Sequence, residues 1–196
     1  MNRQILLLTF LALLTIGAGP KTHQYVGESV SRSYSCGAIF PDWGTVSGYG
    51  ELSVVAHSEA FREAYGSPDA FIRGVAVHAA TDILWDSGFK AEAMAQDEAS
   101  ELDVEMAVDI FLIIEHGARR SFDSSTCQVD KAVRTYGALG HDVTGQQIND
   151  GLAVLQRIML LERIGAWFVY PDFVSRLPWT HANYYSAIRS IINEVG

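Results

Sequence analysis

Residues 74–85 read GVAVHAATDILW, a mostly apolar stretch whose ionisable residues are His78 and Asp82. Apolar residues recur at every fourth position through and before it: Phe71, Val75, Ala79 and Ile83. This spacing predicts a helix, and Ser67 and Pro68 are typical of a helix start. Because His78 and Asp82 are four residues apart, we expect them on one face of that helix.

Helical periodicity dominates the rest of the chain as well. Further helices are expected at about residues 22–30, 52–65, 100–115, 128–136, 144–163 and 181–195. Residues 31–50 contain several Gly residues and a Pro, so they are expected to form a long ordered loop. Strand signals are weak, and the fold class we expect is all-α, a multi-helix bundle.

Length and composition indicate one globular domain. The chain has 196 residues, of which 48% are hydrophobic, and this argues against intrinsic disorder. Its formal net charge is -9. Because nucleic-acid phosphates are held by Lys and Arg, this charge argues against duplex nucleic acid as a partner. It does not exclude a metal enzyme acting on phosphates, since bound cations reverse the local field.

The N-terminus is typical of a secretory signal. Arg3 precedes an apolar run from Ile5 to Ile16, which is short for a membrane span, and small residues follow it. Cleavage after Gly17 would make residues 1–17 a signal peptide and residues 18–196 the mature domain. Cleavage after Ala18 and an uncleaved anchor are the alternatives. The expected location is therefore secreted or periplasmic.

The two cysteines, Cys36 and Cys127, allow one intramolecular pairing. An exported protein with an even number of cysteines favours a disulfide. Two buried free thiols are the alternative, because sequence does not show whether the sulfur atoms meet.

His78 and Asp82 need partners, because burying a lone carboxylate in an apolar helix is costly. An imidazole and a carboxylate one turn apart can present two metal ligands. A local hydrogen bond between them at the helix surface is the alternative. His23 and His57 are further candidate ligands, although a lone His in an apolar helix is more often a hydrogen-bonded core residue.

Three carboxylates follow one stripe of the expected helix at residues 100–115. Glu101, Glu105 and Asp109 occupy positions i, i+4 and i+8. They repel one another unless cations lie between them. A solvated face is the alternative, but such a face usually includes Lys or Arg, and this stripe has none.

The ordered set of these signals resembles the zinc-dependent phospholipase C family, whose wider group includes single-strand-specific nucleases. In chain order the signals are GPKTH at residues 19–23, GAIFPD at 37–42, His57, His78 with Asp82, and Glu105. No single motif is specific, and the resemblance lies in their order. It implies an all-α bundle with a cluster of up to three zinc ions between helices.

The resemblance also implies a ligand set. Its members are His23, Asp42, His57, His78, Asp82, Glu101 and Glu105. Asp42, which lies at the metal centre in that family, is expected to be catalytic by orienting or deprotonating the water. Glu101 stands where the family has a histidine, and carboxylate sites suit harder cations. Two or three zinc ions are therefore expected, and the third site lacks its imidazole.

The leading hypothesis is an exported zinc-dependent phosphoesterase that hydrolyses a phospholipid or similar phosphodiester with metal-activated water. Transient contact with a membrane surface would accompany this role. One alternative is a single-strand nuclease or nucleotidase with base-stacking aromatics, for which the candidates are Phe40, Trp43, Trp85 and Trp167. Another is a metal-binding domain that has lost catalysis.

Overall fold

The computed structural model of the protein describes residues 19–118 and 124–196. Within these residues every regular element is a helix, and none is a strand, so the expected all-α class is confirmed. The predicted signal peptide, residues 1–17, lies outside the described residues and stays a prediction. Among the described helices, none has the length and apolar character needed to cross a membrane.

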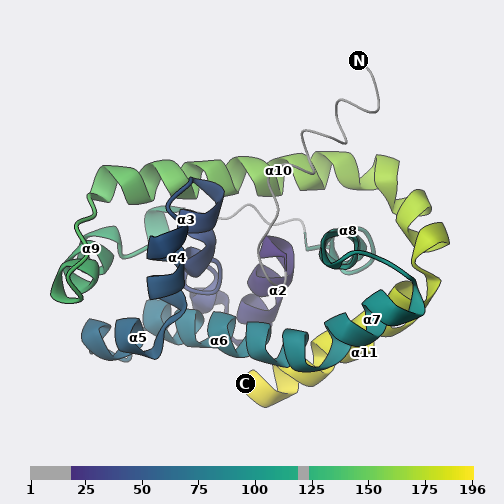
Figure 1. Ribbon diagram of the computed structural model, residues 1–196, viewed down its shortest axis with the longest axis horizontal. Coiled ribbons are helices and arrows are strands. Elements are labelled where there is room, and N and C mark those ends of the chain that lie inside the picture. The colour runs from purple at the N-terminus through teal and green to yellow at the C-terminus, as the bar shows by residue number, and fades with distance from the viewer. Residues whose placement is uncertain (1–18, 119–123) are drawn as a thin grey trace.

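The described helices surround a central α2. In chain order they are α2 (Pro20–Val30), α3 (Trp43–Val46), α4 (Gly50–His57), α5 (Glu59–Tyr65), α6 (Ala70–Leu84), α7 (Lys90–Gln96), α8 (Glu101–Glu115), α9 (Val129–Ala138), α10 (Gly145–Arg176) and α11 (Pro178–Val195). Short 3-10 turns are η1 (Arg32–Tyr34), η2 (Phe40–Asp42) and η4 (Ser124–Thr126), and η3 (Trp85–Phe89) is a π-helical turn. Figure 1 shows α10 along one long edge of the molecule, α6 along the opposite side, and α2 between them.

Capping residues move two of the predicted boundaries. The helix expected to start at Ser67 and Pro68 is α6, and it begins after Asp69, whose carboxylate accepts a hydrogen bond from the Ile72 N–H. The helix expected at residues 52–65 is two helices, because Ser58 has extended backbone and caps α5. The expected loop at residues 31–50 contains η1, η2 and α3.

Helix α10 is longer than predicted. It begins with a capping box formed by Thr144 and Gln147, and it continues past the predicted end near residue 163 to Arg176. Ala166 and Phe173 are buried on this extension, so the apolar face that holds α10 against the molecule does not stop at the predicted end. On α6, by contrast, Ile83 was expected on the buried face and is exposed.

Two apolar clusters form the core. One includes Val26 of α2 and joins α6, α8, α10 and α11. The other includes Phe40 and Trp43, together with residues of α5, α9 and the first half of α10. The Trp43 indole N–H donates to the Tyr136 hydroxyl at 3.0 Å, which ties η2 and α3 to α9. The segments that carry the candidate site, α2 and η2, are thus anchored in different clusters.

Cys36 and Cys127 form a disulfide, with their Cα atoms 5.5 Å apart and a separation of 91 positions in sequence. The bond decides between the two alternatives that the sequence left open. It ties the segment just before η2 to the segment just before α9. It therefore restrains the loop from which Asp42 projects.

Candidate metal centre

Three histidines and two aspartates from four segments of the chain meet at one place, which we call the His/Asp centre. Its members are His23 of α2, Asp42 of η2, His57 of α4, and His78 and Asp82 of α6. His78 Nε2 lies 2.9 Å from His57 Nε2 and 3.2 Å from an Asp82 oxygen. His23 Nε2 lies 3.0 Å from the other Asp82 oxygen. The five predicted ligands other than Glu101 and Glu105 are therefore brought together.

The His/Asp centre divides into two overlapping groups that could hold a metal ion. One is His23, His78 and Asp82, and the other is Asp42, His57 and His78. Within each group the candidate ligand atoms all lie within 4.8 Å of one another. Atoms about 2.0–2.3 Å from one ion must lie at such separations. His78 belongs to both groups and is the member they share.

Backbone carbonyls orient two of the imidazoles. His57 Nδ1 lies 2.7 Å from the Ser53 carbonyl oxygen, and His78 Nδ1 lies 2.7 Å from the Ala38 carbonyl oxygen. Because a carbonyl oxygen can only accept, the Nδ1 of each ring carries a proton and donates it. The Nε2 atoms of both rings then face the centre, which is the arrangement used by metal-ligating histidines.

The groups that face the His/Asp centre meet one another rather than outside hydrogen-bond donors. His57 Nε2 and His78 Nε2 are 2.9 Å apart, a distance at which the two nitrogens must share a proton or bind a cation. Burial, reinforced by His78, lowers the pKa of His57 to about 4, so that ring does not take a proton at neutral pH. Both oxygens of Asp42 are buried without a hydrogen-bond partner. Buried groups of this kind require a partner.

The two carboxyl groups are shifted in opposite directions. Burial raises the pKa of Asp42 to about 7, although the nearby His78 opposes the shift. Burial would also raise the pKa of Asp82, but His23 and His78 outweigh it and hold that pKa well below its ordinary value. The Asp82–His23 contact is at ion-pair distance, but its atoms lack directed hydrogen-bond geometry. Asp82 is thus the permanent anion of the centre.

The GPKTH motif is explained by Asp109, which caps the start of α2. Its carboxylate accepts hydrogen bonds from the Lys21 N–H at 2.9 Å, the Thr22 N–H at 2.8 Å and the Thr22 hydroxyl at 2.7 Å. A Cβ at Gly19 would lie 2.5 Å from an Asp109 oxygen, so a side chain does not fit there. Gly19 and Thr22 therefore fix the helix start that carries His23 into the centre.

A close approach of two glycines brings the Ala38 carbonyl to His78. A Cβ at Gly74 of α6 would lie 2.8 Å from the Gly37 Cα and 2.5 Å from the Tyr34 carbonyl oxygen. Only glycine at this position lets α6 pack directly on the loop before η2. The same packing places Asp42 near His78, with 3.7 Å between its oxygen and Nε2.

Glu101 and Glu105, which were predicted to be ligands, belong to neither group of the His/Asp centre. Glu101 is exposed and pairs with the Lys90 ammonium at 2.6 Å. Glu105 is buried on the same stripe, where burial, reinforced by Glu101, raises its pKa to about 10. Lys90 thus supplies the positive charge that the stripe lacks in the sequence. Lys90 lies on α7, whereas the stripe lies on α8, so the helical periodicity of α8 could not reveal this pair.

Asp109 is the residue near the site whose role the sequence did not identify. It lies on the same stripe of α8 as Glu101 and Glu105, but its carboxylate accepts hydrogen bonds from the start of α2. The aromatic residues proposed for base stacking are also placed elsewhere. Phe40, Trp43 and Trp85 are fully buried, and Trp167 lies exposed on α10.

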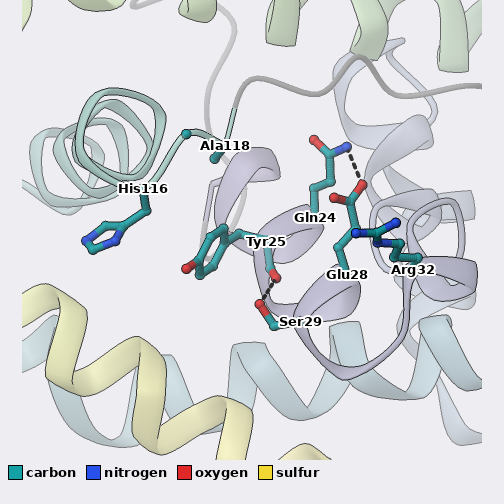
Figure 2. A pocket seen from close by; sticks show the side chains of 8 residues that line it. Gln24, Tyr25, Glu28, Ser29, Arg32, His116 and Ala118 are labelled. Carbon is teal, nitrogen blue, oxygen red and sulfur yellow. Dashed lines mark hydrogen bonds between the residues drawn. The ribbon is translucent and has the colours of Figure 1, made fainter.

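A separate pocket of about 260 Å³ lies on another face of α2. Figure 2 shows Gln24, Tyr25, Glu28 and Arg32 along it, with His116 across from them. The Gln24 amide donates to the Glu28 carboxylate at 2.9 Å, so these two polar groups of the pocket are hydrogen-bonded to each other. None of its lining residues belongs to the His/Asp centre.

Comparison with protein-family models, with curated proteins and with solved structures finds no match for the chain in any of the three.

Proposed function

We propose that the protein is an exported, zinc-dependent phosphoesterase that hydrolyses a phospholipid or a similar phosphodiester. One observation carries the proposal: two imidazole Nε2 atoms and two aspartates converge with no proton donor aimed at Asp42. A cation satisfies all of these acceptors at once. Mixed imidazole and carboxylate ligands are the usual set for catalytic zinc.

The ligand assignment follows the two groups. Asp42, His57 and His78 would hold one ion, and His23 with Asp82 would hold a second beside it. Among the described residues, Glu101 and Glu105 lie outside both groups, which supports two ions rather than three. When bound, such an ion supplies a Lewis acid that polarises a phosphoryl oxygen and lowers the pKa of water.

The exposed and the buried members of the His/Asp centre have different roles. The side chains of His57 and Asp82 are 30% and 20% exposed, whereas those of His78 and Asp42 are fully buried. Substrate therefore approaches from the side of His57 and Asp82. His78, fixed by the Ala38 carbonyl, keeps the ligand geometry, and Asp42, buried beside it, would orient or deprotonate the water.

The nuclease alternative is weakened by the burial of Phe40, Trp43 and Trp85, which removes them as base-stacking groups. A metal-binding domain without catalysis is the second candidate. The placement of Glu101 and Glu105 outside the centre favours it, because the resembled family uses ligands from that helix.

Hydrolysis assays test the proposal. The purified protein is given phosphatidylcholine vesicles, bis-p-nitrophenyl phosphate or single-stranded DNA, before and after treatment with a chelator. We expect phosphodiester cleavage that the chelator abolishes and added zinc restores. His78→Ala should be inactive, and His181→Ala, which removes a histidine outside the centre, should be active. If the protein binds zinc but cleaves none of these substrates, the phosphoesterase proposal is wrong and the protein is a metal-binding domain without catalysis.

A further inference from the structure

The outer face of α10 carries a stripe of large apolar side chains that are exposed. Its members are Leu160 (44% exposed), Leu161 (48%), Ile164 (56%), Trp167 (59%) and Phe168 (75%). We call these five residues the α10 stripe. They are most of the large hydrophobic side chains that the described residues expose, and they lie within nine consecutive positions of one helix.

Helical geometry gathers the α10 stripe on one side. At about 100° per residue its five positions fall within an arc of about 120°. Arg157 continues the same side two turns before Ile164, and Pro171 continues it two turns after. Glu162 lies on the opposite side and is buried. Figure 1 shows α10 along one long edge of the molecule, and the exposure of the five side chains puts the α10 stripe on the side of this helix that faces away from the core.

The acidic groups that dominate the whole chain are absent from the surface of the α10 stripe. The chain carries a net charge of -9. Between residues 157 and 171 the one acidic side chain, Glu162, is buried, and Arg157 is exposed. Beyond the stripe, Asp172 is paired with Arg176 at 3.4 Å. The α10 stripe thus has an exposed cation and no exposed carboxylate along its length.

We propose that the α10 stripe docks the protein on a phospholipid surface, with α10 lying in the plane of the interface. Trp167 and Phe168 would enter the boundary between headgroups and acyl chains, where aromatic side chains are favoured. Arg157 would lie at the level of the lipid phosphates, which attract cationic side chains.

Shape and size favour a lipid surface over a second copy of the chain. Five side chains on one helix are few beside the roughly 20–30 residues per partner that a standard protein interface uses. A planar bilayer surface can contact the whole length of α10, and shallow insertion of a few aromatic anchors suffices for reversible binding. This docking requires neither a bound metal nor catalysis, so it stands independently of the proposed function.

Vesicle co-sedimentation tests the proposal. The chain beginning at Ala18 contains every described residue and lacks the N-terminal apolar run, which would itself bind lipid. It is mixed with phosphatidylcholine vesicles containing a quarter of phosphatidylglycerol. We expect binding that Trp167→Ala combined with Phe168→Ala weakens at least about tenfold. Val54→Ala is the matched control, because Val54 is 72% exposed on α4 and should bind like the wild type.

Folding is checked in parallel, and because the substituted side chains are exposed, all variants should keep the wild-type melting temperature. Equal vesicle binding by the wild type and the double variant would overturn the proposal. So would a wild type that does not bind vesicles at all. A dimer in gel filtration that the double variant breaks, without vesicle binding, would overturn it in favour of self-association.

Discussion

Among the described residues, two clusters combine histidine with carboxylate, and they differ in whether the carboxylate receives hydrogen bonds. At the end of α8, Glu115 accepts hydrogen bonds from Tyr170 at 2.6 Å, His181 at 2.6 Å and Tyr184 at 2.7 Å. We call these four residues the Glu115 cluster. In the His/Asp centre, both oxygens of the buried Asp42 have no hydrogen-bond partner.

The difference lies in the supply of protons rather than in the residue types. Tyrosine hydroxyls donate to Glu115, and although burial opposes the shift, the bond from Tyr170 and its neighbours lowers the Glu115 pKa. The Glu115 cluster therefore ties α8, α10 and α11 together as a structural feature. In the His/Asp centre, the proton on each Nδ1 of His57 and His78 is used by a backbone carbonyl. These two rings turn Nε2 inward, the atom through which a histidine in this arrangement binds a metal.

The largest effect is expected from Asp42→Asn. If Asp42 takes the proton, this substitution should lower phosphodiesterase turnover by about 10²–10⁴-fold while a reduced but measurable amount of zinc stays bound. Turnover and zinc content are measured on the same preparation. Glu115→Gln is the matched change in the other cluster and should keep full activity. A fully active Asp42→Asn variant would remove Asp42 from the mechanism.

Glu115→Gln should instead affect stability. A carboxyl with a lowered pKa stabilises the fold above the pKa of the unfolded chain, and that contribution is lost as pH falls through the folded value. With Glu115 28% exposed, we expect a loss on the order of 1 kcal/mol in urea unfolding at pH 7. The loss should shrink below about pH 4. A stability cost that is the same at pH 3 and pH 7 would contradict the ionised hydrogen-bond cluster.

Zinc binding should release a proton from Asp42. Because its pKa is raised to about 7, Asp42 carries a proton below that pH and must lose it to become a ligand. The pKa of His57, lowered to about 4, keeps that ring neutral in the same range. We expect release of up to about one proton per ion at pH 6 and fewer at pH 8, with zinc affinity rising in between. Calorimetry in buffers of different ionisation enthalpy measures this, and a release independent of pH would count against Asp42 as a ligand.

The smallest effect is expected from Glu101→Gln, although the sequence predicts Glu101 as a ligand. Its exposed pair with Lys90 should contribute no more than about 0.5 kcal/mol to stability. Zinc content should be unchanged. A clear loss of zinc in this variant would mean that α8 contributes to the metal site after all.

The sequence predicted the all-α class and the approximate positions of most helices. Apolar residues that recur with a 3.6-residue period over a long stretch are a strong signal for a helix. It also predicted five residues that the fold brings together: His23, Asp42, His57, His78 and Asp82. Boundaries were less accurate where a cap decided them. Asp69 and Ser58 each moved a helix start, and the buried Ala166 and Phe173 extended α10.

Contacts between distant segments account for what the sequence could not predict. The carboxylates of α8 looked alike on one stripe, yet Glu101 meets Lys90 and Asp109 meets the start of α2. The carbonyls of Ser53 and Ala38 that orient the imidazoles carry no sequence signal at all. Which side chains meet a donor, and which are left facing one another, depends on the packing of the whole chain.

The zinc content of three purified proteins shows whether the His/Asp centre holds metal. After equilibration with zinc and removal of the excess, the wild type should retain one or two ions per chain. His78→Ala, which removes the member shared by both groups, should retain close to none, and His181→Ala should match the wild type. A wild type without zinc, or a His78→Ala variant that keeps its full complement, would contradict the account.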